Sequence, residues 1–145
     1  MEQAKKHLKI SSMLVLLFVG ISLLEIATEL MFGDINSAPI PDGAPDNILL
    51  ITKTFVMVVA LVLMLPKIYV GIKGLKIAKY PNASKTHIIW AVIIFVFTLL
   101  GLVEPAMAIL KQDSVNISAL FGVLLELAIY YDYIKYAKLV AKMSE

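Results

Sequence analysis

The sequence predicts an all-α integral membrane protein, built as a bundle of four membrane-spanning helices. Of the 145 residues, 60% are hydrophobic and 17% are charged, and the mean hydropathy is +0.88. A soluble domain has about 45–50% apolar and about 25% charged residues. The chain also contains four apolar runs, each long enough to cross the hydrocarbon layer of a bilayer as a helix. Together these two observations fix the fold class.

The first apolar run covers residues 10–32 and follows a short segment with three lysines. A secretory signal has this order of features, but its apolar core is shorter. This run also carries Glu25 and Glu29 near its end, and no clean small-residue cleavage site follows. We therefore expect an uncleaved first spanning helix. Residues 33–47, which are rich in Pro, Gly and Asp, should form an outer loop.

The second spanning helix is predicted over residues 48–65, with Lys53 near its start. Pro66 should kink or end this helix, because its ring removes a backbone donor and clashes with the preceding turn. Residues 66–87 then form a basic loop that holds five lysines and the glycines of a flexible surface segment. The first part of this loop can stay helical along the membrane surface.

The third spanning helix is predicted over residues 88–110. At 1.5 Å per residue this run is about 34 Å long, enough to cross the hydrocarbon layer. Its one charged residue is Glu104, directly before Pro105. Because a carboxylate at membrane depth is costly, Glu104 should have either a partner or a function.

A tight polar turn at residues 111–116 leads to the fourth spanning helix, residues 117–136, with Glu126 near its middle. Residues 137–145 form a basic tail. Four tyrosines lie at the end of this helix: Tyr130, Tyr131, Tyr133 and Tyr136. Tyrosine rings are typically found at the level of the lipid headgroups. We therefore expect this end of the helix to lie at the membrane surface.

The distribution of lysines predicts the topology. Three lysines precede residue 10, five lie in residues 66–87 and three follow residue 134, whereas the two outer loops hold Lys111 and four aspartates. Eleven of the thirteen lysines therefore fall on one side of the membrane. By the positive-inside rule, both termini and the middle loop face the cytoplasm. We expect a multi-pass protein of a bacterial or archaeal plasma membrane.

Two short matches raise the question of an internal repeat. Residues 22–27 (SLLEIA) resemble residues 101–106 (GLVEPA), and residues 69–76 (YVGIKGLK) resemble residues 131–138 (YDYIKYAK). Two helical hairpins related by an axis along the membrane normal would produce both matches. Chance together with shared interfacial chemistry would produce them as well, so a 2+2 repeat of hairpins is one of two interpretations.

Charged residues inside the spans are the candidate site. Helical rise places Glu25, Lys53 and Glu104 in the outer third of the bilayer. By the same count, Glu29 lies at the outer interface and Glu126 near the midplane. They share helix faces with small or polar residues, so we expect them to line an outward-opening polar cavity. The excess negative charge would be neutralised by protons or by a bound cation.

Three functions are compatible with this pattern. The first is a proton- or cation-coupled transporter or ligand-binding protein that uses the intramembrane carboxylates, with Lys53 as counter-charge. The second is a non-catalytic accessory or scaffold subunit, which would dock through a Lys-rich cytoplasmic face and the tyrosine cluster: Lys73, Lys76, Lys79, Tyr130 and Tyr133. The third is a membrane enzyme acting on lipid. A simpler interpretation is that Lys53 pairs with Glu25 or Glu104 only to hold two helices together.

Other chemistries find little support in the sequence. The chain has no cysteine and no arginine, and its two histidines, His7 and His87, lie far from the intramembrane acids. We therefore expect no catalytic constellation, metal centre, cofactor or nucleic-acid partner. The expected partners are the lipid bilayer and a proton or small cation. Because four thin helices around charged residues seldom close well alone, we also expect a homo-oligomer or a partner membrane subunit.

Overall fold

The structure is a computed structural model that describes residues 2–32, 48–82, 84–111, 114 and 116–144, and these contain helices and no strand. The helices are α1 (Glu2–Phe32), α2 (Ile48–Lys79), α3 (Thr86–Leu100), α4 (Val103–Leu110) and α5 (Ile117–Lys142). Four segments are long and apolar enough to cross a membrane: Glu2–Thr28, Leu50–Lys79, Thr86–Leu110 and Ile117–Lys142. The all-α fold with four candidate spans is thus confirmed. The predicted outer loop, residues 33–47, lies outside the described residues.

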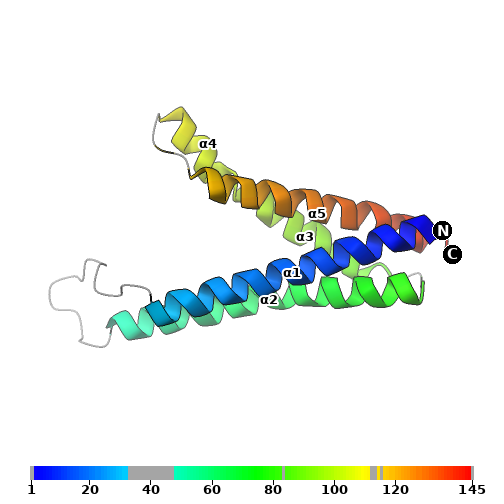
Figure 1. Ribbon diagram of the computed structural model, residues 1–145, viewed down its shortest axis with the longest axis horizontal. Coiled ribbons are helices and arrows are strands. Elements are labelled where there is room, and N and C mark those ends of the chain that lie inside the picture. The colour runs from blue at the N-terminus through cyan, green and yellow to red at the C-terminus, as the bar shows by residue number, and fades with distance from the viewer. Residues whose placement is uncertain (1, 33–47, 83, 112–113, 115, 145) are drawn as a thin grey trace.

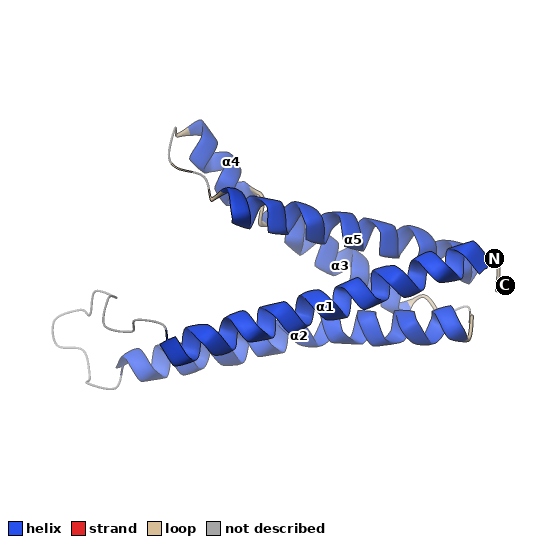
Figure 2. Cartoon of the chain, in the orientation of Figure 1, coloured by secondary structure: helices blue, strands red, loops and turns tan. Residues whose placement is uncertain are grey.

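The four spans form a ring of antiparallel neighbours. Helix α1 packs against α2 and α5, and α3 packs against the same two helices. Helices α2 and α5 therefore occupy opposite corners of the ring. Both chain termini lie at one end, where the α1–α2 hairpin meets the hairpin of α3, α4 and α5 (Figure 1). The two hairpins diverge toward the other end (Figure 2). We call these the closed end and the open end.

The buried core belongs to the closed half of the bundle. Its residues fall within 4–19 of α1, 64–78 of α2, 87–94 of α3 and 127–141 of α5. They recur at intervals of three and four, as in helices packed side by side. Toward the open end the helices carry exposed apolar side chains, such as Leu24, Phe55 and Phe121. Such a surface is compatible with contact with lipid, which is as apolar as these side chains.

Helix α2 does not end at Pro66, where the sequence predicted a kink or an end, but continues to Lys79. Beyond Pro66 it still presents a buried face, which includes Val70, Gly74 and Ile77. Packing of this face against the neighbouring helices outweighs the single backbone hydrogen bond that a proline removes. Packing of the same kind extends α1 and α5 beyond their predicted spans.

The third span is broken, which the sequence did not predict. Helix α3 ends at Leu100 and α4 begins at Val103. At the break the chain tightens, because the Gly101 amide donates to the Thr98 carbonyl at 3.0 Å, only three residues back. Pro105 explains the position of the break. It lies in the first turn of α4, where an amide donor is not required.

Helices α1, α2 and α5 pack closely where they meet at Gly74. A Cβ atom added to Gly74 of α2 would lie 2.5 Å from Cε2 of Tyr133 and would also collide with the hydroxyl of Ser12. The Tyr133 hydroxyl donates a hydrogen bond to the Val70 carbonyl at 2.9 Å, and the Ser12 hydroxyl donates to the Leu8 carbonyl at 2.6 Å. The missing side chain of Gly74 thus lets two opposite helices approach each other.

A buried imidazole lies beside this contact. His87 is 0% exposed, and its ring meets the Tyr133 ring edge-on at 6.0 Å between centroids. Neither of its nitrogens has a hydrogen-bond partner within the described part of the chain. A buried polar group without a partner costs roughly 1–3 kcal/mol. The imidazole therefore lowers the stability of the core.

We expect His87→Leu to raise the free energy of unfolding by about 1 kcal/mol, because an apolar side chain loses no hydrogen bond with water on burial. The measurement is a denaturant titration of the purified protein with sodium dodecyl sulfate. His7→Leu is the control, because the His7 ring is only half-buried and stacks on Tyr136. A destabilised His87→Leu variant would show that the imidazole stabilises the core.

Candidate functional site

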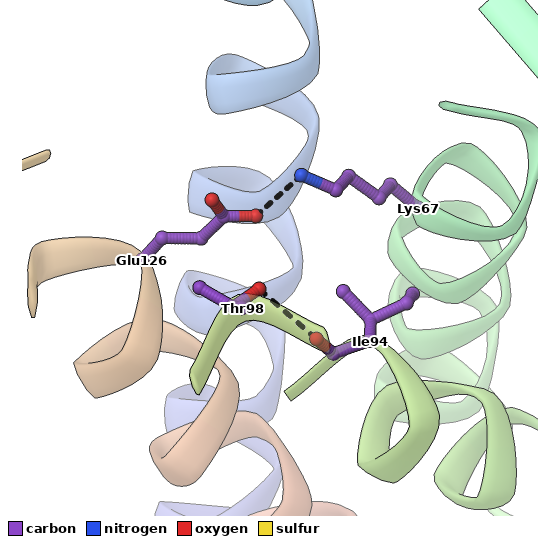
Figure 3. Close-up of polar contacts among 4 residues, drawn as sticks. All are labelled: Lys67, Ile94, Thr98 and Glu126. Atoms are coloured by element: carbon purple, nitrogen blue, oxygen red, sulfur yellow. Dashed lines mark hydrogen bonds and ion pairs between the residues drawn. The ribbon is translucent and has the colours of Figure 1, made fainter. Parts of the chain in front are cut away.

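An ion pair crosses the bundle between two opposite helices. Nζ of Lys67, on α2, lies 2.6 Å from Oε1 of Glu126, on α5. The two side chains point toward each other across the interior (Figure 3). They are 30% and 19% exposed, respectively. The pair is therefore largely sheltered, but part of each side chain remains accessible from outside the protein.

The pair lies near the limit of the buried core that faces the open end. Lys67 is one turn from Val70 and Glu126 is two turns from Tyr133, in both cases toward the open end. On α5, every buried residue lies after Glu126 in sequence, that is, on its closed-end side. At 1.5 Å per residue, Glu126 is about 13 Å from the open end of α5 and about 24 Å from its closed end. The pair thus lies at the boundary between the buried core of the closed half and the more exposed open half.

A threonine of α3 appears in the same view as the ion pair (Figure 3). The Thr98 hydroxyl donates a hydrogen bond to the Ile94 carbonyl at 3.0 Å, within its own helix. Buried apolar residues lie one to three positions from the paired residues in sequence: Met64 on α2 and Leu127 on α5. The described site is therefore one carboxylate paired with one ammonium, with buried apolar residues at neighbouring positions.

Among the acids predicted to share a cavity, Glu126 is the one with a described ion pair. Glu25 is exposed on α1 and makes no ion pair within the described residues. Glu29, Lys53 and Glu104 occupy helical positions, but their side chains lie outside the described part of the chain. Their convergence with Glu126 stays a prediction.

The residues predicted to face a partner separate into two groups. Lys76 and Lys79 are exposed near the end of α2, and Lys73 is half-buried. Tyr130 and Tyr133 are instead 2% and 0% exposed, packed in the core between helices, and their level relative to the lipid headgroups stays a prediction. They are buried because they share a face of α5 with the other core residues of that helix, and Tyr133 gains a hydrogen-bond acceptor there.

The sequence analysis did not place Lys67 in the site, because Pro66 was expected to kink or end the helix and residues 66–87 were assigned to a basic loop or an interfacial helix. A signal was present in the sequence. Counted along a helix, Met64, Lys67, Gly71 and Gly74 recur at intervals of three and four, and so lie on one face. Continuing the helical pattern through the proline would have placed Lys67 on the inner face.

No group of three or more His, Asp or Glu residues that could hold a metal ion is found within the described residues. The described polar contact between helices at this site is the Lys67–Glu126 ion pair. Comparisons of the chain with protein-family models, curated proteins and solved structures find no match.

Proposed function

We propose that the protein is a small membrane transporter or ligand-binding protein in which a proton and a small organic cation compete for the Glu126 carboxylate. The observation that carries the proposal is the Lys67–Glu126 pair, which joins opposite helices near the limit of the buried core. A lysine that serves as an internal counter-charge can be displaced by a cation from outside. Binding would then be coupled to protons, because the carboxylate takes up either one.

The chemistry of Lys67 supports such an exchange. Its four-carbon stem is flexible, and lysines near membrane surfaces extend their ammonium groups toward water. Lys67 lies three turns before the end of α2, about 18 Å by helical rise. When a proton or a cation neutralises Glu126, the ammonium of Lys67 is released from the pair and can turn away from the packed core, because part of its side chain is already exposed.

The surroundings favour an organic cation over a metal ion. Calcium takes six to eight oxygen ligands, and magnesium usually keeps several waters. The described site offers one carboxylate, with buried apolar residues at neighbouring positions on the same two helices. A cation that spreads its charge over an apolar body needs one counter-charge and apolar walls, which is what these residues provide.

Orientation follows from the lysines. The basic residues that flank the spans gather at the end where both termini lie. By the positive-inside rule this closed end faces the cytoplasm. The Lys67–Glu126 site then opens toward the outer leaflet, and a cation would reach it between the hairpins.

The test is binding of tetraphenylphosphonium, a lipophilic cation, to the full-length protein in lipid nanodiscs. We expect binding to weaken as the pH falls, and Glu126→Gln to weaken it about 30-fold or more, because losing a sheltered charge partner costs 2–5 kcal/mol. Lys67→Met, which removes the competitor, should strengthen binding. Asp132→Asn is the control on the same helix. Wild-type affinity in Glu126→Gln would refute the proposal.

A non-catalytic accessory subunit is the second candidate. Lys76 and Lys79 are exposed on successive turns at the end of α2, where they could contact a partner subunit. A stoichiometric membrane partner that is lost when Lys73, Lys76 and Lys79 are replaced by Gln would favour this role. If the protein does not bind tetraphenylphosphonium and such a partner is found, the accessory-subunit role is favoured over the transporter.

A further inference from the structure

A groove of about 610 Å³ lies between α3 and α5 at the closed end. Its apolar lining comes from Ile88, Ile89, Val92 and Ile93 of α3 and from Ala141 of α5. Three lysines complete the lining: Lys85, Lys138 and Lys142. The volume is within the range of about 300–1,000 Å³ that is typical of small-molecule sites. None of these residues belongs to the Lys67–Glu126 site.

Charge and apolar surface are separated along the groove. On α3, the lining residues from Lys85 to Ile93 recur at intervals of three and four, so they share one helix face. The lysine precedes the first helical residue, and the apolar residues follow it toward the open end. By helical rise they extend about 12 Å from Lys85. The positive end of the groove thus lies at the closed end of the bundle, and its apolar part runs along the span.

The lysines supply the positive charge. Lys138 and Lys142 are exposed and one turn apart on α5, so both ammonium groups can reach one anion. The N-terminus of α3 and the C-terminus of α5 meet at this end of the bundle, and the partial charges of the two helix dipoles oppose each other there. Between the two lysines, Ala141 has a small side chain that leaves the floor of the groove open.

We propose that this groove binds one anionic phospholipid, with its phosphate between Lys138 and Lys142 and one acyl chain along the isoleucine and valine side chains of α3. A headgroup anion complements the lysines, and a hydrocarbon chain complements the apolar wall. A free anion would match the first feature only. The proposal requires the four helices to lie in a bilayer but is independent of cation binding at Glu126.

The charge test is native mass spectrometry of the full-length protein titrated with dioleoyl phosphatidylglycerol. We expect one lipid to bind in preference to phosphatidylcholine. Lys138→Gln/Lys142→Gln should weaken its binding about 25-fold, because each lysine contributes about fivefold near an anionic headgroup. Lys76→Gln/Lys79→Gln removes the same charge from α2 and should leave binding unchanged. An equal loss in both variants would show diffuse attraction and overturn the proposal.

The apolar wall is tested separately. Ile89 is 60% exposed, so Ile89→Trp should fill the groove without disturbing the core, and should abolish the preference for phosphatidylglycerol. Val96→Trp, at a site on α3 that is 50% exposed and outside the groove, is the control. Excess inorganic phosphate should not displace the lipid. Displacement of the lipid by phosphate, or full lipid binding by Ile89→Trp, would overturn the proposal. The tetraphenylphosphonium assay on the same variants reports independently on the Glu126 site.

Discussion

Replacing Gly74 with alanine should destabilise the bundle by about 1–3 kcal/mol, the usual range for overpacking a tight core. The new Cβ would lie 2.5 Å from Cε2 of Tyr133. That ring cannot easily move away, since it is 0% exposed and its hydroxyl is bonded to the Val70 carbonyl. Either α2 moves away from α5 or the hydrogen bond is lost.

The other glycines of the chain provide matched controls. At Gly71, a Cβ would meet the side chain of Leu16 at 2.6 Å, which can change rotamer, so the loss should be smaller. At Gly20 and Gly122, a Cβ would meet nothing within 4 Å, and alanine should be neutral or slightly stabilising. Sodium dodecyl sulfate titrations give the free energy of unfolding of each glycine-to-alanine variant, and so rank the variants by their loss of stability. Equal effects at Gly74 and Gly20 would contradict the close approach of α2 and α5.

Replacing Lys67 with methionine should destabilise the protein by roughly 2 kcal/mol at neutral pH, because it leaves the Glu126 carboxylate sheltered and unpaired. The loss is smaller than the 3–5 kcal/mol of a fully buried pair, since 30% of the Lys67 side chain is exposed.

Two double variants separate loss of the pair from loss of packing. Lys67→Met/Glu126→Leu removes both charges and should recover most of the stability, as apolar replacement of ion pairs often does. The exchanged pair Lys67→Glu/Glu126→Lys should also recover part of it. Unfolding titrations at neutral pH give the free energies of unfolding of wild type, Lys67→Met and the two double variants. A double variant no more stable than Lys67→Met would show that the pair does not connect α2 and α5.

Much of the fold was predictable because apolar run length is a strong signal. The four candidate spans follow from it directly. The positions of the helix ends were harder to predict from the sequence, because they depend on packing between helices. The extension of α2 through Pro66 is stabilised by the fit of Gly74 against Tyr133, a contact 59 residues away in sequence. By contrast, the break before Pro105 is a local effect, which the Gly101 to Pro105 segment could have indicated.

The candidate site was harder to predict. Glu126 was recognised as an intramembrane acid, because its charge stands out in an apolar run. Its partner was not, because pairing depends on which helices lie at opposite corners of the ring. Residue type alone did not show which of the tyrosines would be buried. The face of α5 that carries Tyr130 and Tyr133 turns them inward, while Tyr131, on another face, is 60% exposed.

Competition between a proton and a cation for Glu126 is tested most directly by infrared titration of its carboxyl group. The signal is the difference between wild type and Glu126→Gln in nanodiscs, followed across pH with and without tetraphenylphosphonium. We predict that the cation moves protonation of Glu126 to lower pH, because it binds the ionised form. Protonation at the same pH with and without saturating cation would contradict the account.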